Sequence, residues 1–228
     1  MTPWADKAWS EDVASHPTLR LYAKLHPAPT FARYLDVDDD PEATALRGQL
    51  RMNVYPLASI IAHRGHRKAE AAQRACPVCH PRRRQPLEGA KCLLCGGGVE
   101  DVHHVLLACP ALRPEQRSLR TAAVQACESA AVKECLDTAR RNGQEALDEA
   151  VLMLVLGGDP TGHGEGGAFM SPAPKTSRAA PAADRVRALR ATNAPLRRIE
   201  SKRRRLLNSR PSLPRTWTVY AQYAAQDR

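Results

Sequence analysis

The feature that most constrains the fold is a set of metal-ligating side chains with the spacing Cys92-x2-Cys95-x8-His104-x4-Cys109. Two thiolates two residues apart in a tight turn can bind one metal ion, and a His and a Cys five residues apart can complete a tetrahedral site. The glycines at 96–98 allow the chain to reverse behind the first pair. Four ligand-type residues within 18 positions therefore predict a zinc site that holds the surrounding chain in place.

The use of cysteine along the whole chain also favours metal binding over disulfide formation. Seven cysteines are an odd number, and four of them form Cys-x2-Cys pairs. The first 25 residues carry scattered charge and lack the apolar segment of a secretory signal. We therefore expect an intracellular protein, nuclear or cytoplasmic, with reduced thiols. Zinc bound by three thiolates and one imidazole has no open position for water, so this site is expected to be structural.

Other residues of ligand chemistry leave two choices open. His103 competes with His104 as the imidazole ligand, and the loop length favours His104. Three upstream residues also have ligand chemistry: Cys76, Cys79 and His80. They can form a second zinc site with a fourth ligand such as His103, or they can be a stray group beside an arginine-rich loop. The two remaining cysteines, Cys127 and Cys135, lie in a helical pattern and are expected to pack in the core.

The basic charge is concentrated near the C-terminal end. Lys and Arg number 34 against 24 Asp and Glu, a formal net charge of +10. Residues 178–215 contain 12 basic and 2 acidic side chains, which leaves 22 of each sign elsewhere. A basic segment on a neutral body is typical of proteins that bind RNA or DNA through phosphates, and the alternative is a solvated tail without a binding role. The side chains expected to contact nucleic acid are Arg197, Arg198, Lys202, Arg203, Arg204 and Arg205.

The apolar pattern predicts a mainly α fold in three parts. A small helical body at 11–157 surrounds the zinc knuckle at 76–109. Residues 158–183 are expected to be a disordered, flexible linker, because they are rich in Gly and Pro and poor in apolar side chains. Residues 184–228 form a basic, partly helical C-terminal arm. The longest apolar run, at 150–156, is too short to span a membrane, so no membrane association is expected.

Two long helices and one shorter helix are predicted for the body. The first runs over 41–61 with a kink at Pro56, because Pro suits the first turn of a helix but disrupts its interior. The second runs over 114–142 and ends at an Asn-Gly pair, and the shorter helix follows at 146–156. The last two are expected to form an antiparallel pair that closes the body.

The run VEDVHHVLLACP at 99–110, preceded by the Cys92–Cys95 pair, resembles a known family. It is similar to the C-terminal zinc-knuckle region that follows the reverse transcriptase in non-LTR (LINE-like) retrotransposon polyproteins. In that family a Cys-x2-Cys is followed by a Glu-rich turn, a His, two or three apolar residues and Cys-Pro. The resemblance assigns the family's His to His104, and with similar upstream segments it covers about residues 18–120. Many relatives have one Cys-x2-Cys before the His-Cys half, whereas this chain has two.

The resemblance implies a binding role rather than catalysis. The polymerase is missing, since its palm needs an aromatic residue before two aspartates that hold Mg2+, and the nearest string, at 37–40, has Val in that place. No phosphate-binding loop, nucleophile elbow or zinc-protease helix is present in the sequence. We therefore predict a fragment of a LINE-type reverse transcriptase that binds RNA or DNA, is not an enzyme and takes no small-molecule substrate.

Two alternatives stay open beside this interpretation. One is a zinc-dependent protein-interaction module of the RING type, although a cross-braced domain needs a further Cys-x2-Cys after Cys109 and the next residues offer none. The other is a decayed element without a function.

Overall fold

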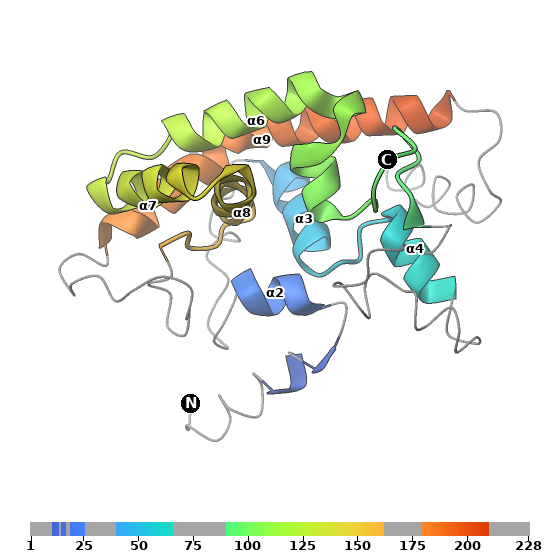
Figure 1. Ribbon diagram of the computed structural model, residues 1–228, viewed down its shortest axis with the longest axis horizontal. Coiled ribbons are helices and arrows are strands. Elements are labelled where there is room, and N and C mark those ends of the chain that lie inside the picture. Colours follow the sequence, from blue (N-terminus) through green and yellow to red (C-terminus); the bar gives the residue numbers. More distant parts are fainter. Residues whose placement is uncertain are drawn as a thin grey trace.

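The computed structural model describes residues 11–13, 15–16, 19–25, 40–65, 90–161 and 179–209. Within these ranges the protein is mainly helical, as predicted, and the only β pairing is an isolated bridge between Lys91 and Val99 (Figure 1). The helical elements are α2 (Arg20–Leu25), α3 (Pro41–Arg51), α4 (Ala58–Gly65), η5 (His104–Ala108), η6 (Pro110–Leu112), α6 (Arg113–Gln125), α7 (Ala130–Arg141), α8 (Gln144–Val155) and α9 (Ala179–Asn208).

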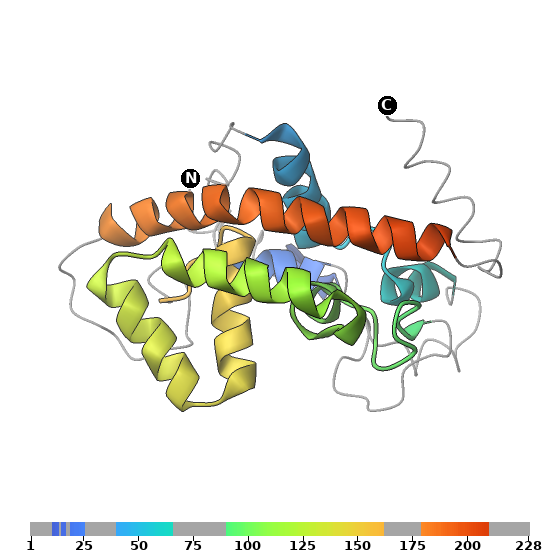
Figure 2. The same cartoon turned by 90° about the horizontal axis from the view of Figure 1, so that it is seen from above.

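The two longest helices, α6 and α9, lie side by side and antiparallel, and Figure 2 shows them along the length of the molecule. The hairpin of α7 and α8 lies at one end, and α4 lies at the other (Figure 2). Elements α3, α8 and η5 pack against this helix pair, and their apolar faces form one core. Its fully buried side chains include Leu50, Leu57, Leu106, Leu112, Leu119, Leu154, Leu196 and Ile199.

The helix predicted at 41–61 is two helices. Its start is as expected, because Pro41 lies in the first turn and the Asp40 side chain accepts a hydrogen bond from the Ala43 N–H at 3.0 Å. A turn then separates α3 from α4. Asn53 has a φ of +52°, which Asn tolerates better than most residues, and Pro56 disfavours helical geometry in the residue before it. The expected kink is therefore a complete break.

The helix predicted at 114–142 is likewise interrupted, at residues 126–129. Ser129 begins α7 as its N-cap and accepts a hydrogen bond from the Val132 N–H. The Asp184 carboxylate of α9 accepts hydrogen bonds from the Glu128 and Ser129 N–H groups at 3.0 and 2.9 Å. Asp184, 55 positions from Ser129 in the chain, thus satisfies the backbone N–H groups of the turn between α6 and α7. Local sequence patterns cannot reveal a partner at this distance.

The C-terminal arm does not extend from the body over 184–208, because α9 is one wall of the core. Its buried apolar side chains include Ala188, Leu189, Leu196, Ile199 and Leu207. The helix also continues through Pro195 without a new start. Removing α9 would expose the apolar surfaces of α3, α6 and α8, so the body is not a separate folding unit.

A buried arginine of α3 connects this helix to α8 and α9. Arg47 of α3 is 1% exposed and donates hydrogen bonds to the carbonyl oxygens of Val155 and Leu189 and to the side chains of Thr192 and Asn193. Val155 is the last residue of α8, where backbone carbonyls lack helical donors and the helix dipole favours a cation. Thr192 and Asn193 thus lie inside α9, where their side chains are acceptors for this guanidinium.

The segment predicted as a linker, 158–183, is shortened at both ends by residues that belong to the folded structure. Residues 158–161 pack against the body, since Thr161 is buried and the Cys135 thiol donates to the Pro160 carbonyl at 3.0 Å. At the other end α9 begins at Ala179. Residues 162–178, and the part of the arm after 209, lie outside the described residues. None of the helices in the described ranges has both the length and the apolar composition needed to cross a bilayer.

We expect Asp184→Asn to lower the free energy of unfolding at pH 7 by about 2 kcal/mol, because the carboxylate is fully buried and holds the α6–α7 turn. Burial raises the pKa of Asp184, but hydrogen bonds from Ser129, the Glu128 N–H and Arg187 outweigh burial and hold the pKa below its usual value. This stabilisation is complete above the unfolded pKa of about 3.9 and is lost as the pH falls through the lower folded pKa.

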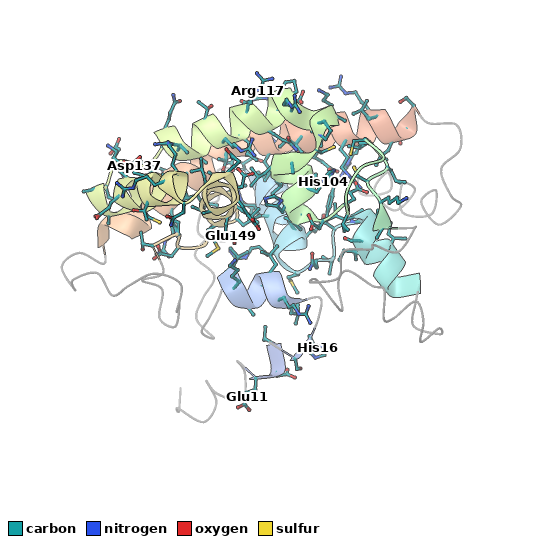
Figure 3. The ribbon with its side chains drawn as sticks, viewed as in Figure 1. Glu11, His16, His104, Arg117, Asp137 and Glu149 are labelled. Atoms are coloured by element: carbon teal, nitrogen blue, oxygen red, sulfur yellow. The ribbon has the colours of Figure 1, made fainter. Side chains whose placement is uncertain are left out.

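Denaturant titrations of the variant at pH 7 and at decreasing pH measure this effect. The matched control is Asp137→Asn, since Asp137 has an exposed side chain on α7 that pairs only with the exposed Arg140 among the described residues (Figure 3). The control should change stability by less than about 0.5 kcal/mol. Equal effects of the two substitutions would contradict the role given to Asp184.

Candidate metal centre

The first two ligand-type side chains lie on a short hairpin whose glycines make the reversal possible. The Cys92 N–H donates to the Gly98 carbonyl at 3.0 Å, and the Gly96 N–H donates to the Cys92 carbonyl at 2.8 Å. Gly96 and Gly98 have φ angles of +71° and +37°, a region that side chains disfavour. A Cβ on Gly98 would also lie 3.4 Å from His104 Nδ1. The reversal predicted from the glycine run is therefore confirmed at these two positions.

The other two ligand-type side chains lie at the ends of the π-helical turn η5. The Cys109 N–H donates to the His104 carbonyl at 2.7 Å, a bond that spans five residues. Residues five apart point about 140° away from each other on an α-helix, and the wider π turn brings them closer to one side. Pro110 favours an extended Cys109, which has a ψ of 117° and ends the turn.

All four side chains meet at one point. Their ligand atoms, the sulfurs of Cys92, Cys95 and Cys109 and a ring nitrogen of His104, lie within 4.8 Å of one another. The Cys92 and Cys109 sulfurs are 3.8 Å apart, and Cys95 Sγ lies 3.4 Å from His104 Nε2. Cys92 and Cys109 are buried, whereas Cys95 and His104 are partly exposed. This donor set can hold one metal ion near the surface of the protein.

The protonation of the cluster is strongly coupled. The hydrogen bond with Cys109 and burial raise the pKa of the Cys92 thiol to about 12. The same hydrogen bond lowers the pKa of Cys109, because it stabilises the thiolate form. The contact with Cys92 raises the pKa of His104. Contacts within the cluster are therefore the main cause of the pKa shifts of three of its four members.

Two residues that the sequence analysis did not single out fix the position of His104. The Asp101 carboxylate accepts a hydrogen bond from the His104 N–H at 2.7 Å, and the Gln116 side chain donates to the His104 carbonyl at 3.2 Å. Gln116 is buried on α6 and also donates to the Val105 carbonyl at 2.9 Å. An Asp three residues before a helical segment is a recognisable cap signal, whereas the contact from Gln116 depends on the tertiary fold.

The adjacent histidine points elsewhere. His103 Nε2 lies 3.8 Å from the carboxylate of Asp148 on α8. That carboxylate is 5% exposed overall and accepts two hydrogen bonds from Arg120 and one from Gln144. The structure therefore brings His104 into the cluster and places His103 beside a different acceptor.

The remaining residues of ligand chemistry do not join this cluster. Cys127 and Cys135 are buried and donate to the carbonyls of Ala123 and Pro160, so they pack in the core as expected. Their pKa values are raised by burial, which keeps both as neutral thiols. The residues of the predicted second site, Cys76, Cys79 and His80, lie outside the described residues.

A buried ion pair connects the hairpin to α9. Glu100 is 0% exposed, and its carboxylate accepts hydrogen bonds from Arg203 Nε and the Ala58 N–H at 2.9 and 3.1 Å. Arg203 is 2% exposed and also donates to the Tyr55 hydroxyl and the Pro56 carbonyl. The prediction that Arg203 contacts nucleic acid is therefore corrected. Its guanidinium is buried and bonded to the Glu100 carboxylate, so a phosphate cannot reach it.

The other predicted nucleic-acid ligands divide into two groups. Arg197 pairs with Asp40 and Glu42, Arg204 pairs with Glu200, and Lys202 pairs with Glu115. Arg198 and Arg205 are exposed, and no carboxylate in the described part of the chain forms an ion pair with either. Arg198 instead donates to the Ser118 hydroxyl of α6 at 2.9 Å. Acidic side chains of the body and of α9 itself thus neutralise part of the charge on this helix.

Comparison with known proteins finds no matching family model, no matching curated protein and no matching solved structure.

Proposed function

We propose that the protein is a non-catalytic nucleic-acid-binding module whose fold is stabilised by zinc at the Cys92, Cys95, His104 and Cys109 cluster. With Zn–S bonds of about 2.3 Å and Zn–N bonds of about 2.0 Å, a tetrahedral site separates two sulfurs by about 3.8 Å and a sulfur and a nitrogen by about 3.5 Å. The distances of 3.8 Å and 3.4 Å in this cluster agree with those values. Three thiolates and an imidazole also suit zinc better than magnesium or calcium, which prefer oxygen.

The proposed zinc is structural because four protein ligands fill a tetrahedral site and leave no position for water. It joins the hairpin at 92–100 to η5, which leads through the short turn η6 into α6. Zinc binding in small metal-stabilised modules contributes on the order of 10 kcal/mol to folding. The metal would therefore fix the start of α6, the helix along which α9 packs.

Nucleic-acid binding is supported chiefly by the arginines that stay exposed on the paired helices α6 and α9. The chain has a formal net charge of +10, which attracts polyanions. Arg113 and Arg117 on α6 and Arg198 and Arg205 on α9 are exposed. The motif at 92–110 adds its resemblance to the zinc-knuckle region of LINE-type reverse transcriptases, whose relatives use that region to hold template RNA or target DNA. We propose the same class of partner and a fragment of such a polyprotein as the origin of the chain.

The test is a titration of the full, zinc-loaded chain with RNA and DNA, single-stranded and duplex, at several salt concentrations. Because phosphate contacts release counterions, about four contacts predict an affinity loss of about a hundredfold between roughly 50 and 200 mM salt. The full chain is required because α9 is part of the core. Absence of binding to every one of these nucleic acids at the lowest salt would refute the proposed function.

A further inference from the structure

We infer that the phosphate-binding surface of the protein is the seam between α6 and α9, and that the opposite flank of α9, which faces α3, does not take part. This inference rests on the proposed nucleic-acid binding and assigns it to particular side chains. The seam cluster consists of four charged residues: Glu115 of α6 and Arg198, Lys202 and Arg205 of α9.

Hydrogen bonds between the two helices define the seam. Lys202 Nζ lies 2.9 Å from a carboxylate oxygen of Glu115, and Arg198 Nη2 lies 2.9 Å from Ser118 Oγ. Burial raises the pKa of Glu115, but the hydrogen bond from Lys202 and the charges of Lys202 and Arg205 outweigh it and lower the pKa. Arg205 lies three residues after Lys202, on the same side of α9.

Two exposed arginines of α6, Arg113 and Arg117, lie outside the seam on the outer side of that helix. Arg117 precedes Ser118, the residue that Arg198 reaches, and its side chain points outward from α6 (Figure 3). Arg113 lies one turn before Arg117, about 6 Å along the helix axis. Arg198 and Arg205 are two turns apart, about 10.5 Å, a length that covers about three phosphates of one strand.

The balance of charge differs between the two sides of α9. The seam cluster contains three basic side chains and one carboxylate, a net charge of +2. On the flank that faces α3, three arginines seven residues apart, Arg190, Arg197 and Arg204, are balanced by Asp40, Glu42 and Glu200, which gives no net charge. A phosphate backbone is attracted to the first surface and gains nothing from the second.

The chemistry of the seam cluster favours nucleic acid over an anionic membrane. Two of its three cations are arginines, whose planar groups can donate two hydrogen bonds to one phosphate. The exposed residues beside them, which include Pro114, Thr121 and Ala194, offer no large apolar side chain to insert into a lipid surface. The neighbouring α6 keeps α9 from entering a groove alone, so we expect contacts to the backbone without a sequence preference.

The experiment compares two double variants of the full chain that remove the same charge from the same helix. Arg198→Gln with Arg205→Gln alters the seam cluster, and Arg197→Gln with Arg204→Gln is the control on the α3 flank. Both pairs are exposed and seven residues apart. We expect the seam variant to weaken binding at least about tenfold at physiological salt and to reduce the salt slope by about 2, and the control to change affinity less than about twofold.

Circular dichroism and zinc content check that both variants fold, and Arg113→Gln with Arg117→Gln tests the outer side of α6 without touching α9. Equal losses in the seam and control variants would show that binding follows net charge alone, and an unchanged seam variant would place binding elsewhere; either result overturns this inference while the proposed function stands. Failure of the unaltered protein to bind any nucleic acid refutes both. Tighter binding to anionic phospholipid vesicles than to nucleic acid, lost in the seam variant, would also overturn it.

Discussion

Replacing His104 by alanine is expected to remove most of the bound zinc and to loosen the chain from 92 to 112, whereas replacing His103 by alanine should leave the zinc content intact. Of these two histidines, His104 has a ring nitrogen at ligand distance from the cysteine sulfurs, while His103 lies beside Asp148. A structural zinc contributes on the order of 10 kcal/mol, so its loss exceeds the total stability of many small domains. Elemental analysis and thermal unfolding of the two purified variants measure the difference.

The unaltered protein, expressed with sufficient zinc, is the reference for this comparison and should carry at least one zinc per chain. Cys92→Ser should behave as His104→Ala does, because Cys92 is a buried member of the same cluster. A zinc content below about half an ion per chain in the reference protein would refute the metal assignment. Loss of zinc in His103→Ala with retention in His104→Ala would show that the imidazole ligand is misassigned.

The second large effect is expected at the buried pair of Glu100 and Arg203. Arg203→Met leaves a fully buried carboxylate with its ionic partner removed and should lower the free energy of unfolding by about 3–5 kcal/mol. The neighbouring Arg204→Met removes an exposed arginine and should cost less than about 0.5 kcal/mol. Denaturant midpoints of the two variants measure this contrast between adjacent residues of one arginine run.

A double variant separates the ion pair from the packing around it. Glu100→Leu with Arg203→Met removes both charges, so it should be less unstable than the sum of the single variants, with a coupling energy of at least about 1 kcal/mol. Additive effects, or equal effects of Arg203→Met and Arg204→Met, would contradict the buried pair.

The metal cluster was predictable from the sequence because its constraints are local. The Cys-x2-Cys turn, the glycines behind it and the five-residue spacing before Pro110 all act within 18 residues, and the four predicted side chains do meet. The choice of His104 over His103 followed from spacing as well. The partners that fix His104 were only half predictable, because Asp101 is a local cap and Gln116 comes from the next helix.

The fate of the basic segment was not predictable in the same way. Arg203 and Arg204 are adjacent residues of the same type, and nothing in the sequence distinguishes them. In the structure Arg203 is buried against Glu100, whereas Arg204 lies at the surface. What separates them is the rotation of α9, set by apolar residues such as Leu196 and Ile199 that face the core. A count of charges along the chain shows where the surplus lies but not which cations the folded body neutralises.

The long connections made by α9 have a consequence for the synthesis of this protein. Arg47 is bonded to Asn193 across 146 residues, and Arg203 to Tyr55 across 148. At about 5–20 residues per second, a ribosome needs on the order of ten seconds to make the chain between such partners. During that interval α3 and α6 have emerged, but the helix that covers them has not. The nascent chain therefore exposes this apolar face until α9 has been made, and the incomplete chain is most prone to aggregation during that interval.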